Sequence, residues 1–547
     1  MFRKSKNQQQ LNLFNSTVFL NAQSLKEYEN DKNWHNIFYT EITEKIVEEI
    51  FRELFCENNG APNYSIRVLV AMLILKAARG CSDAQLFEDC KFNLLVRRAL
   101  GLVNANDKPP AESTYYRFKS LVEAREKAGL GNLIEEVFIS ITKAQIKEFN
   151  ISGSKIRLDS TLIGSNLAWN GRYALIHESL RVAYKKGKSE IENFLTKLDK
   201  ERLQQLSIES GENISYHSNK TELETRLNKL GALIYKIVLN TQHTQNEEIK
   251  TLHQVFSEHF EVVEGVVKVL PKEKIKSNSI QSPHDTDSRN RSKGEQKVTG
   301  FSGNITETCD ENNPVNLITN VILAPATTSD VDFLQPAIEA TQEILEDEIE
   351  TINADGGYHS PDNQDFCRER RIDLILSAIS GAPSRYDLEI AENGDLLVYD
   401  RQNKKYITAI KSKSYKGVTN GSWYITTEEG KRKYFSIKNV ETCQIRRLID
   451  KRSLEELYLR NNVEATAFQL CYHLSGKKSR YRGLFKHKIW ALLRCIWINF
   501  ARIMKYLKNG GLKPINTSEI RCIFRLFLSF FANLLNFHQK LHFFCKI

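Results

Sequence analysis

The sequence predicts a mixed α/β protein whose core is a mixed sheet covered by helices. The first observation is a succession of three strand patterns, with a turn cluster at 310–314 between the last two. The second is a pair of strand patterns joined by a short helix, which is typical of a parallel strand-helix-strand unit. The third is that separate strands of this core carry an acidic residue. The core elements are predicted, in order, as strands at 155–163, 298–308 and 315–324, a helix at 331–349, a strand at 351–354, a helix at 361–370 and a strand at 373–379.

Asp355 follows the predicted strand at 351–354 and precedes Gly356 and Gly357, which allow a sharp turn. Open α/β sheets place their functional sites at the carboxyl tips of their strands. Asp355 is therefore a candidate site residue. The alternative is an ordinary aspartate that begins a turn before glycine.

Asp159 lies near the middle of the first predicted strand, in which the apolar residues Ile156, Leu158 and Leu162 do not share its face. An acidic side chain on a strand that joins a core needs a partner, and a divalent cation is one such partner. The second acidic strand therefore strengthens the interpretation of Asp355.

The N-terminal part is predicted as a flexible arm at 1–30 and a bundle of short helices at 31–150, including a helix at 39–54 and one at 66–78. Several of these helices end in arginine or lysine. A helix-turn-helix arrangement of this kind can place a helix in a DNA groove, so we predict a DNA-binding domain. The alternative is a scaffold bundle that does not touch DNA.

Two insertions are predicted. Residues 170–280 are rich in lysine, glutamate and leucine at helical spacing, which favours an antiparallel helical hairpin or coiled coil. Residues 386–442 contain short strand patterns separated by Asn-Gly, Glu-Gly and Asn-Gly-Asp turns, which predicts a small β-strand insertion with many lysines. Between them, the acidic run at 284–287 offers possible metal ligands, but we favour a solvated loop.

Arg460 and Glu464 are four residues apart on a predicted helix and therefore face one side. Taken alone, they would be interpreted as an exposed ion pair. The segment that follows is basic with an interleaved tyrosine, as in stretches that contact phosphates, and its cations are Lys477, Lys478, Arg480 and Arg482. A long helix at 488–507 comes next, and the apolar tail at 511–547 is expected to be a packing or oligomer helix.

Composition narrows the classes of protein. A chain of 547 residues is too long for one core, and with 41% hydrophobic and 26% charged residues it is globular. A formal charge of +10 permits nucleic acid binding without demanding it. The ten cysteines form no CxxC pair, so we expect reduced thiols in a cytoplasmic protein and no zinc site. We expect no signal peptide, and the apolar run of the tail is shorter than a bilayer span, so no stable membrane insertion is expected.

Taken together, these motifs resemble those of bacterial insertion-sequence transposases of the DDE class, over residues 30–507. The first-acid strand around Asp159 and the second-acid motif around Asp355 resemble those of the family. Tyr458, Arg460 and Glu464 resemble its tyrosine-arginine-glutamate-lysine signature, with the tyrosine one residue closer to the arginine than usual. The signature lysine falls at Cys471, and Lys477, Lys478 or Lys486 are candidates to replace it.

The resemblance implies an RNase H-like catalytic domain made of residues 151–169, 281–385 and 443–510. It implies that Asp159, Asp355 and Glu464 hold two Mg²⁺ or Mn²⁺ ions, that Arg460 orients Glu464 or binds a phosphate, and that Tyr358 and His359 contact the flanking strand. The implied partners are the terminal inverted repeats of the element, target DNA and a second copy of the chain in the synaptic complex. The implied location is the bacterial cytoplasm, on the nucleoid.

Two rival functions stay open. A metal-dependent nuclease of the same fold would use the same three acids without joining DNA ends to a target. A DNA-binding transposase relic would bind DNA without catalysis, and its acids would be structural.

Overall fold

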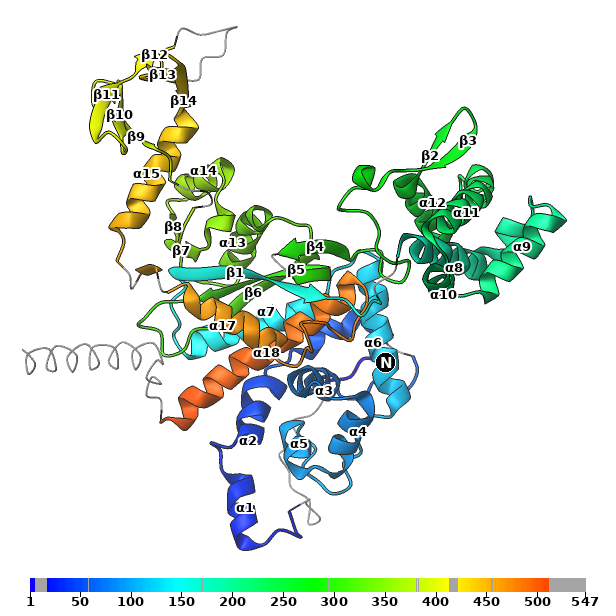
Figure 1. Ribbon diagram of the computed structural model, residues 1–547. Coiled ribbons are helices and arrows are strands. Elements are labelled where there is room, and N and C mark those ends of the chain that lie inside the picture. The colour runs from blue at the N-terminus through cyan, green and yellow to red at the C-terminus, as the bar shows by residue number, and fades with distance from the viewer. Residues whose placement is uncertain are drawn as a thin grey trace, which may run out of the picture.

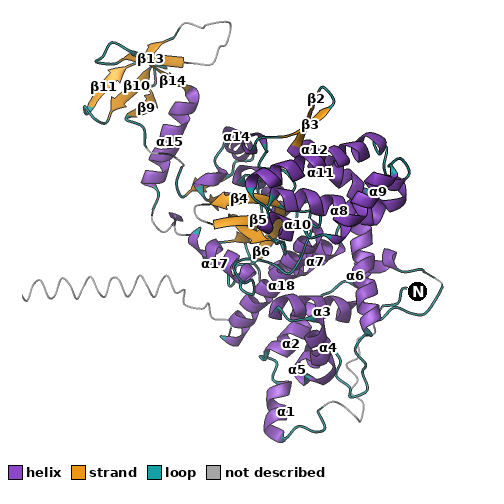
Figure 2. Ribbon diagram, turned by 45° about the vertical axis from the view of Figure 1, so that its right-hand side comes forward, coloured by secondary structure: helices purple, strands orange, loops and turns teal. Residues whose placement is uncertain are grey.

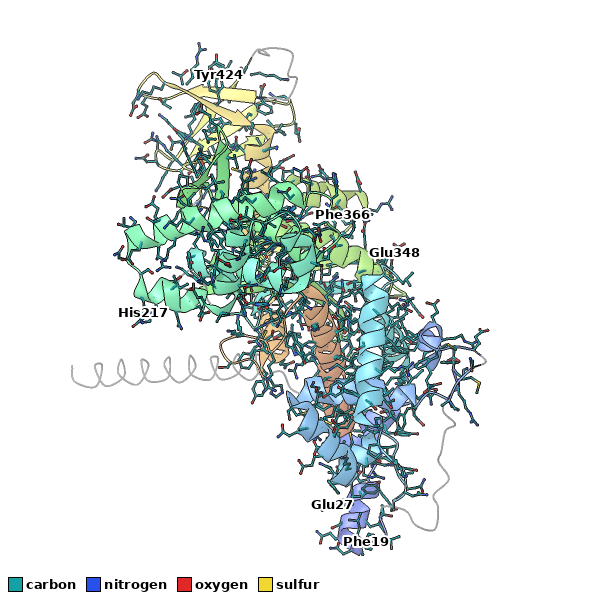
Figure 3. All side chains as sticks on the ribbon, turned by 90° about the vertical axis from the view of Figure 1, so that its right-hand side faces the viewer. Phe19, Glu27, His217, Glu348, Phe366 and Tyr424 are labelled. Atoms are coloured by element: carbon teal, nitrogen blue, oxygen red, sulfur yellow. The ribbon has the colours of Figure 1, made fainter. Side chains whose placement is uncertain are left out.

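The computed structural model describes residues 1–4, 17–57, 59–168, 171–293, 296–379, 381, 383–412, 422–453, 456–457 and 459–510. It is mainly helical around one mixed sheet (Figures 1 and 2). Figure 3 shows Tyr424 of the β-strand insertion and Phe19 near the N-terminus at opposite ends of an elongated molecule. The predicted C-terminal tail helix and part of the predicted arm lie outside the described residues.

The central sheet has the strand order β6-β5-β1-β7-β8, and β4 pairs with the first residues of β5. β1, β5 and β6 pair antiparallel, whereas β7 and β8 continue the sheet in parallel to β1. This arrangement confirms the predicted RNase H-like mixed sheet. The strands are β1 (Lys155–Gly164), β4 (Arg289–Lys293), β5 (Gln296–Thr308), β6 (Ile318–Pro325), β7 (Thr351–Ala354) and β8 (Asp373–Leu376). The short edge strand β4 was not predicted.

Helices cover both faces of this sheet, as Figure 1 shows. The helices α13 (Leu334–Gln342) and α14 (Pro361–Glu369) lie on one face. The short turn η4 (Asp330–Phe333) contacts α13 and the turn η5 (Gly356–Tyr358). The helices α17 (Asn461–Cys471) and α18 (Leu484–Lys508) lie on the other. The helix predicted at 331–349 ends early, at Gln342, whose side chain bonds the backbone of Asp347 and Ile349 and so fixes a loop instead.

The N-terminal helices form the predicted bundle. Ser65 and Ser82 cap α3 and α4, and Gln85 completes a capping box with Ser82. The prediction of a regular helix at 39–54 is wrong. This stretch forms a π-helical turn and a 3₁₀ helix instead. Its β-branched residues have a reduced propensity for a regular α-helix. The elements are α1 (Ala22–Glu29), α2 (Trp34–Phe38), η1 (Tyr39–Thr43), η2 (Glu48–Leu54), α3 (Ile66–Arg79), α4 (Asp83–Phe92), α5 (Leu94–Ala99), α6 (Glu112–Lys127) and α7 (Leu133–Glu148).

Arg494 of α18 connects this bundle to the helices that pack on the central sheet. The buried guanidinium donates to the last carbonyls of α3, at Ala77 (3.3 Å) and Ala78 (3.0 Å). It also donates to the carbonyls of Leu470 (3.3 Å) and Gln469 near the end of α17. One side chain therefore satisfies the open carbonyls of two helices from opposite parts of the chain.

The helical insertion is a separate unit with its own hydrophobic core, on the right in Figure 1. It is a helical bundle with a β-hairpin, so the predicted helical hairpin or coiled coil was too simple. Its described elements are α8 (Arg172–Glu192), α9 (Lys197–Ile208), α10 (Gly211–His217), α11 (Lys220–Asn240), α12 (Glu247–His259), β2 (Phe260–Val263), β3 (Val266–Val269) and η3 (Lys272–Lys274).

The β-strand insertion stands apart at the end of α15 (Ile437–Lys451), at the top of Figure 1. Its described strands form two three-stranded antiparallel sheets that share one small core. The first strand, β9, was not predicted separately. The strands are β9 (Tyr386–Ile390), β10 (Leu396–Asp400), β11 (Lys405–Thr408), β12 (Ile410–Lys411), β13 (Ser422–Thr426) and β14 (Arg432–Ser436).

Among the described helices, none combines the length and the apolar character that crossing a bilayer requires.

A buried charged cluster joins the sheet to α17 and α18. Glu307 of β5 is fully buried and accepts from Arg157 Nε of β1 at 2.5 Å. It also pairs with Arg502 Nη2 of α18 and accepts from Thr466 Oγ1 of α17, both at 2.8 Å. Arg157 Nη1 donates in addition to the carbonyl of Leu459 at 3.0 Å. Burial alone would raise the pKa of Glu307, but the two arginines outweigh it and lower this pKa.

We expect Glu307→Gln to lower the free energy of unfolding at pH 7 by about 3–5 kcal/mol, because the buried Arg157 and the partly buried Arg502 then face a neutral amide. A depressed carboxyl pKa contributes stability that is lost as the pH falls through that pKa. The deficit should therefore shrink below the ordinary glutamate value of 4.5. Urea denaturation at pH 7 and pH 4, followed by tryptophan fluorescence, measures both.

The control is Asp365→Asn, which breaks an ion pair with Arg368 whose side chains are 60% and 69% exposed and should cost less than about 1 kcal/mol. An equal deficit of Glu307→Gln at both pH values would contradict the charged cluster.

Candidate active site

Asp159 and Asp355 lie on neighbouring parallel strands. Arg157 of β1 pairs with Asn353 of β7, so each acid comes two residues further along its strand. Side chains two residues apart share a face, which brings both acids to the same side of the sheet. Backbone amides orient them: Ser160 N–H donates to Asp159 at 2.8 Å and Gly356 N–H donates to Asp355 at 2.7 Å.

Arg460 lies among the three predicted acids. Its Nη2 is 3.3 Å from Asp159 Oδ2, 3.7 Å from Asp355 Oδ2 and 3.1 Å from Glu464 Oε1. The three carboxylates come from β1, the end of β7 and α17, and their side chains are 14%, 42% and 58% exposed, respectively. They thus surround one position of positive charge, with Asp159 the most enclosed and Glu464 open to solvent.

Ser377 belongs to the same constellation, and sequence reasoning missed it. It follows β8 directly, as Asp355 follows β7. Ser377 Oγ donates to Asp355 Oδ1 and accepts from Arg460 Nη1, each at 3.4 Å. Its place at the carboxyl tip of the next parallel strand was the available signal.

Asp159 lies in surroundings that disfavour its charged form. Burial raises the pKa of Asp159, Arg460 lowers it, and the charges of Asp355 and Glu464 raise it again, with a net upward shift. Arg460 Nε is a buried donor for which no acceptor exists among the described residues. Arg460 therefore offsets the negative charge only in part, and its own hydrogen-bonding capacity is incompletely used.

No three His, Cys, Asp or Glu side chains of the described residues stand close enough to share a metal ion as they are. The acids nevertheless supply the donor set that Mg²⁺ and Mn²⁺ prefer, three carboxylates on one solvent-accessible side. The positively charged Arg460 guanidinium occupies the position among them that a metal ion would take. The three carboxylates are therefore chemically suited to bind a divalent ion, provided that the Arg460 side chain moves out from between them.

The predicted strand contact of Tyr358 is wrong. Its side chain is fully buried, and its hydroxyl donates to Asn304 Oδ1 of β5 at 2.6 Å. Tyr358 therefore ties the turn after β7 to the sheet. His359 is half-buried; burial lowers its pKa, and Glu441 of α15 partly opposes this. Tyr458 lies outside the described residues.

The basic segment lies along the end of β1. Lys477 Nζ is 3.4 Å from Thr161 Oγ1, on the face of β1 that carries Asp159. Lys478 and Arg482 donate to the carbonyls of Leu167 and Asn166 at 2.6 and 2.8 Å, so structural contacts engage both side chains. Arg480 is exposed.

Asp285 corrects the prediction of a solvated acidic loop. It is buried, accepts from Ser165, and accepts from Gly483 N–H at 2.9 Å. It therefore links the basic segment to the end of β1.

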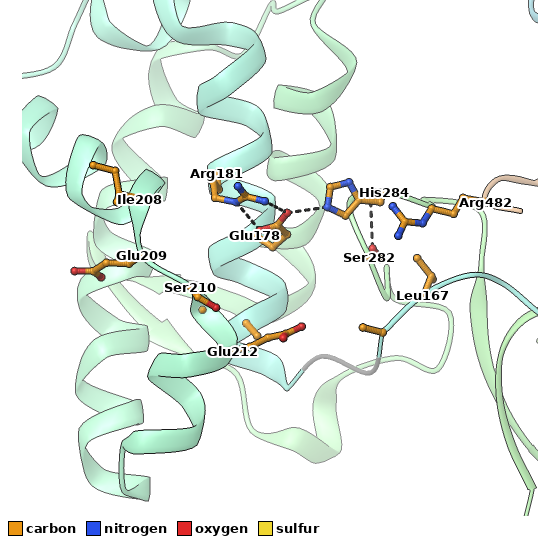
Figure 4. Close-up of a pocket in the computed structure, with 13 residues that line it drawn as sticks. Leu167, Glu178, Arg181, Ile208, Glu209, Ser210, Glu212, Ser282, His284 and Arg482 are labelled. Atoms are coloured by element: carbon orange, nitrogen blue, oxygen red, sulfur yellow. Dashed lines mark hydrogen bonds and ion pairs between the residues drawn. The ribbon is translucent and has the colours of Figure 1, made fainter. Parts of the chain in front are cut away.

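A cavity of about 380 Å³ opens beside this loop, between the helical insertion and Arg482 (Figure 4). Glu178 of α8 bonds both Arg181 (2.6 Å) and His284 (2.7 Å) at its edge. None of the three candidate acids lines this cavity, so it is separate from the candidate active site.

Two family models match the chain. The model described as "Transposase domain (DUF772)" matches residues 25–121, and "Transposase DDE domain" matches residues 277–500. Together they cover more than half of the 547 residues. The chain belongs to the DDE transposase family. The DDE match of this transposase includes Asp355, Arg460 and Glu464 but not Asp159, which precedes it.

One solved structure similar to this transposase is the cryo-EM structure of a piggyBac transposase synaptic complex with hairpin DNA. It shows 9% sequence identity, covers 88% of this chain and 76% of that chain, and has a TM-score of 0.30. A search of curated proteins found no match.

Cys471, which stands where the family signature has lysine, is buried in this transposase, and burial raises its pKa to about 11. It therefore stays a neutral thiol at neutral pH. Lys477 is near enough to influence that pKa and lies along the Asp159 face of β1, which makes it the best placed of the three candidate lysines.

We expect Asp159→Asn to raise the melting temperature of the transposase in EDTA at pH 7 by about 1–3 °C. The reason is that burial and the two neighbouring carboxylates disfavour the Asp159 charge more than Arg460 favours it. Thermal denaturation measures the shift, with Asp365→Asn as the exposed control. A lower melting temperature would mean that the ion pair with Arg460 dominates.

We expect Arg460→Ala to lower the melting temperature in EDTA by about 4 °C, because three carboxylates lose their shared counter-ion. Addition of Mg²⁺ or Mn²⁺ should raise the melting temperature of this variant more than that of the unaltered protein. Arg368→Ala, which removes an exposed cation of α14, is the matched control. Equal responses to the ions in all three proteins would argue against a cation position among the acids.

Proposed function

We propose that this transposase binds the terminal inverted repeats of an insertion sequence and catalyses metal-dependent DNA cleavage and strand transfer. The observation that supports this most directly is the convergence of Asp159, Asp355 and Glu464 on one position of positive charge. In the proposal these three acids hold two divalent ions, Mg²⁺ or Mn²⁺. When bound, such ions activate an attacking water or 3′-hydroxyl and stabilise the leaving oxygen.

In the proposal, the residues of the site have different roles in holding the ions and the DNA. Asp159, enclosed and held by the Ser160 amide, gives the site a fixed ligand, while Asp355 and Glu464 stay open to solvent and to DNA. Arg460 reaches all three acids and is placed to bind a phosphate oxygen through its two Nη groups, in the bidentate manner that lysine cannot adopt. Ser377 orients both Asp355 and Arg460.

DNA binding is proposed for residues 31–150, for the lysine-rich β-strand insertion and for the basic segment with Lys477 and Arg480. Phosphate contacts of this kind position DNA without reading its sequence. A homodimer on paired ends would bring two such sites together, and we propose that it acts on DNA in the bacterial cytoplasm.

The decisive experiment incubates the protein with a DNA fragment that carries the inverted repeats flanking its own coding region, with Mg²⁺ and a target plasmid. We expect nicking at the repeat ends and joined products in the plasmid. Asp355→Asn should reduce cleavage at least 100-fold while leaving binding to the repeats in place, because a neutral amide is a weaker metal ligand.

Asp365→Asn, an exposed acid on α14, is the control and should cleave normally. Cleavage without joined products would favour the nuclease. Specific binding without cleavage in either protein would favour the non-catalytic relic. Cleavage that persists in Asp355→Asn would show that another residue takes its place.

A further inference from the structure

The helix that carries Glu464 also carries one exposed aromatic ring, and a second stands at its C-cap, where the backbone keeps a helical conformation. Phe468 and Tyr472 are 68% and 66% exposed. They follow Glu464 at intervals of four residues, so all three side chains share one face of the helix. The rise of a helix places Phe468 about 6 Å and Tyr472 about 12 Å beyond Glu464 along its axis.

The hydrophobic core does not require these rings. Val463, Thr466 and Leu470, on the opposite face of α17, are almost fully buried against the sheet and α18. The two aromatic side chains therefore leave apolar area exposed to water, which is unfavourable, and they do not contribute to that core. A structural role on α17 does not explain them.

The rings form a continuous row. Phe468 and Tyr472 meet edge to face with centroids 6.0 Å apart, and Tyr472 meets His473 in the same way at 5.1 Å. His473 Nε2 bonds the carbonyl of Ala78, at the end of α3, at 2.6 Å. The row thus runs from the candidate acid to the N-terminal helical domain.

The surroundings of the row favour one occupant. Arg460 contacts Glu464 at the head of the row, and Lys477 lies close enough to Cys471, the residue before Tyr472, to act on the pKa of that thiol. Arg480 follows Lys477 in the chain and is exposed. Positive charge flanking flat apolar rings matches a strand with a phosphate backbone and unpaired bases. A second protein would need about 800 Å² of complementary surface, whereas this patch is two rings bordered by Glu464, Gln469 and His473.

We propose that Phe468 and Tyr472 are a stacking platform for unpaired bases of the DNA strand next to the phosphate that is cleaved. The proposal rests on the proposed function, which puts that phosphate at Asp159, Asp355 and Glu464. A stacked strand advances 3.4 Å per nucleotide, so the platform would hold bases about two to four nucleotides from the phosphate. Stacking does not distinguish bases, so the platform would act on many end sequences.

The test measures DNA binding in EDTA, where cleavage is not needed. The probe is a repeat-end DNA with a four-nucleotide single-stranded extension that carries the fluorescent base 2-aminopurine, which is quenched when it stacks on a ring. The double variant Phe468→Leu/Tyr472→Leu keeps apolar bulk and removes the rings. We expect binding of the extended DNA to weaken about 10-fold and the quenching to disappear, with little effect on fully paired DNA.

Two controls isolate the rings. Phe468→Tyr/Tyr472→Phe keeps both rings and should bind and quench like the unaltered protein. Tyr216→Leu removes an 86% exposed ring from α10 of the helical insertion and should have no effect. Because all three positions are exposed, unchanged melting temperatures should accompany these results.

Unchanged binding and quenching in the leucine variant would overturn the platform, whatever its cleavage activity. A variant that instead changes its oligomeric state in sedimentation would overturn it too and would assign the face to a second copy. Ring-dependent binding without cleavage in Mg²⁺ by the unaltered protein would keep the platform and reject the proposed chemistry.

Discussion

The buried charge of Glu307 is the interaction on which the arrangement of the site depends. It lies in the middle of the sheet, where the guanidinium groups of Arg157 and Arg502, together with the Thr466 hydroxyl, stabilise the buried carboxylate. Those arginines, with Thr466, join β1, β5, α17 and α18 at one point. Because Glu464 lies on the helix that this point fixes, the third acid is positioned by charges that belong to the core rather than by loops.

Polar side chains on one face of β1 contact the segment 459–477 along the length of the strand. Arg157 bonds the carbonyl of Leu459, Asp159 bonds Arg460, and Thr161 bonds Lys477. The three side chains are two residues apart and so point the same way. The segment 459–477 therefore lies along a polar stripe of the central strand, and its direction across the sheet follows from successive polar contacts rather than from apolar packing alone.

Local patterns predicted every strand of the sheet except β4 and selected Asp159 and Asp355 as candidates, whereas Glu464 became a candidate through the family resemblance. Alternation identified β1, two glycines marked the turn after β7, and a spacing of four put Arg460 beside Glu464. Other features depend on residues far away in the chain, which local patterns do not contain. Tyr358 was expected to contact the flanking strand, but its hydroxyl donates to Asn304, 54 residues earlier. Asp285 was expected in a solvated loop, but it accepts from Gly483, 198 residues later. The helical insertion showed its helices in sequence but not their packing.

Arg494 has a consequence for how the molecule opens. Its guanidinium bonds the last carbonyls of α3 and of α17 at once, so separating either helix leaves buried carbonyls of that helix and part of the guanidinium without partners. Local unfolding usually proceeds in units that exchange amide hydrogens together. The end of the helix that carries Glu464 and the end of an N-terminal helix more than 380 residues earlier should thus form one cooperative unit. The end of α3 and the end of α17 should therefore unfold together.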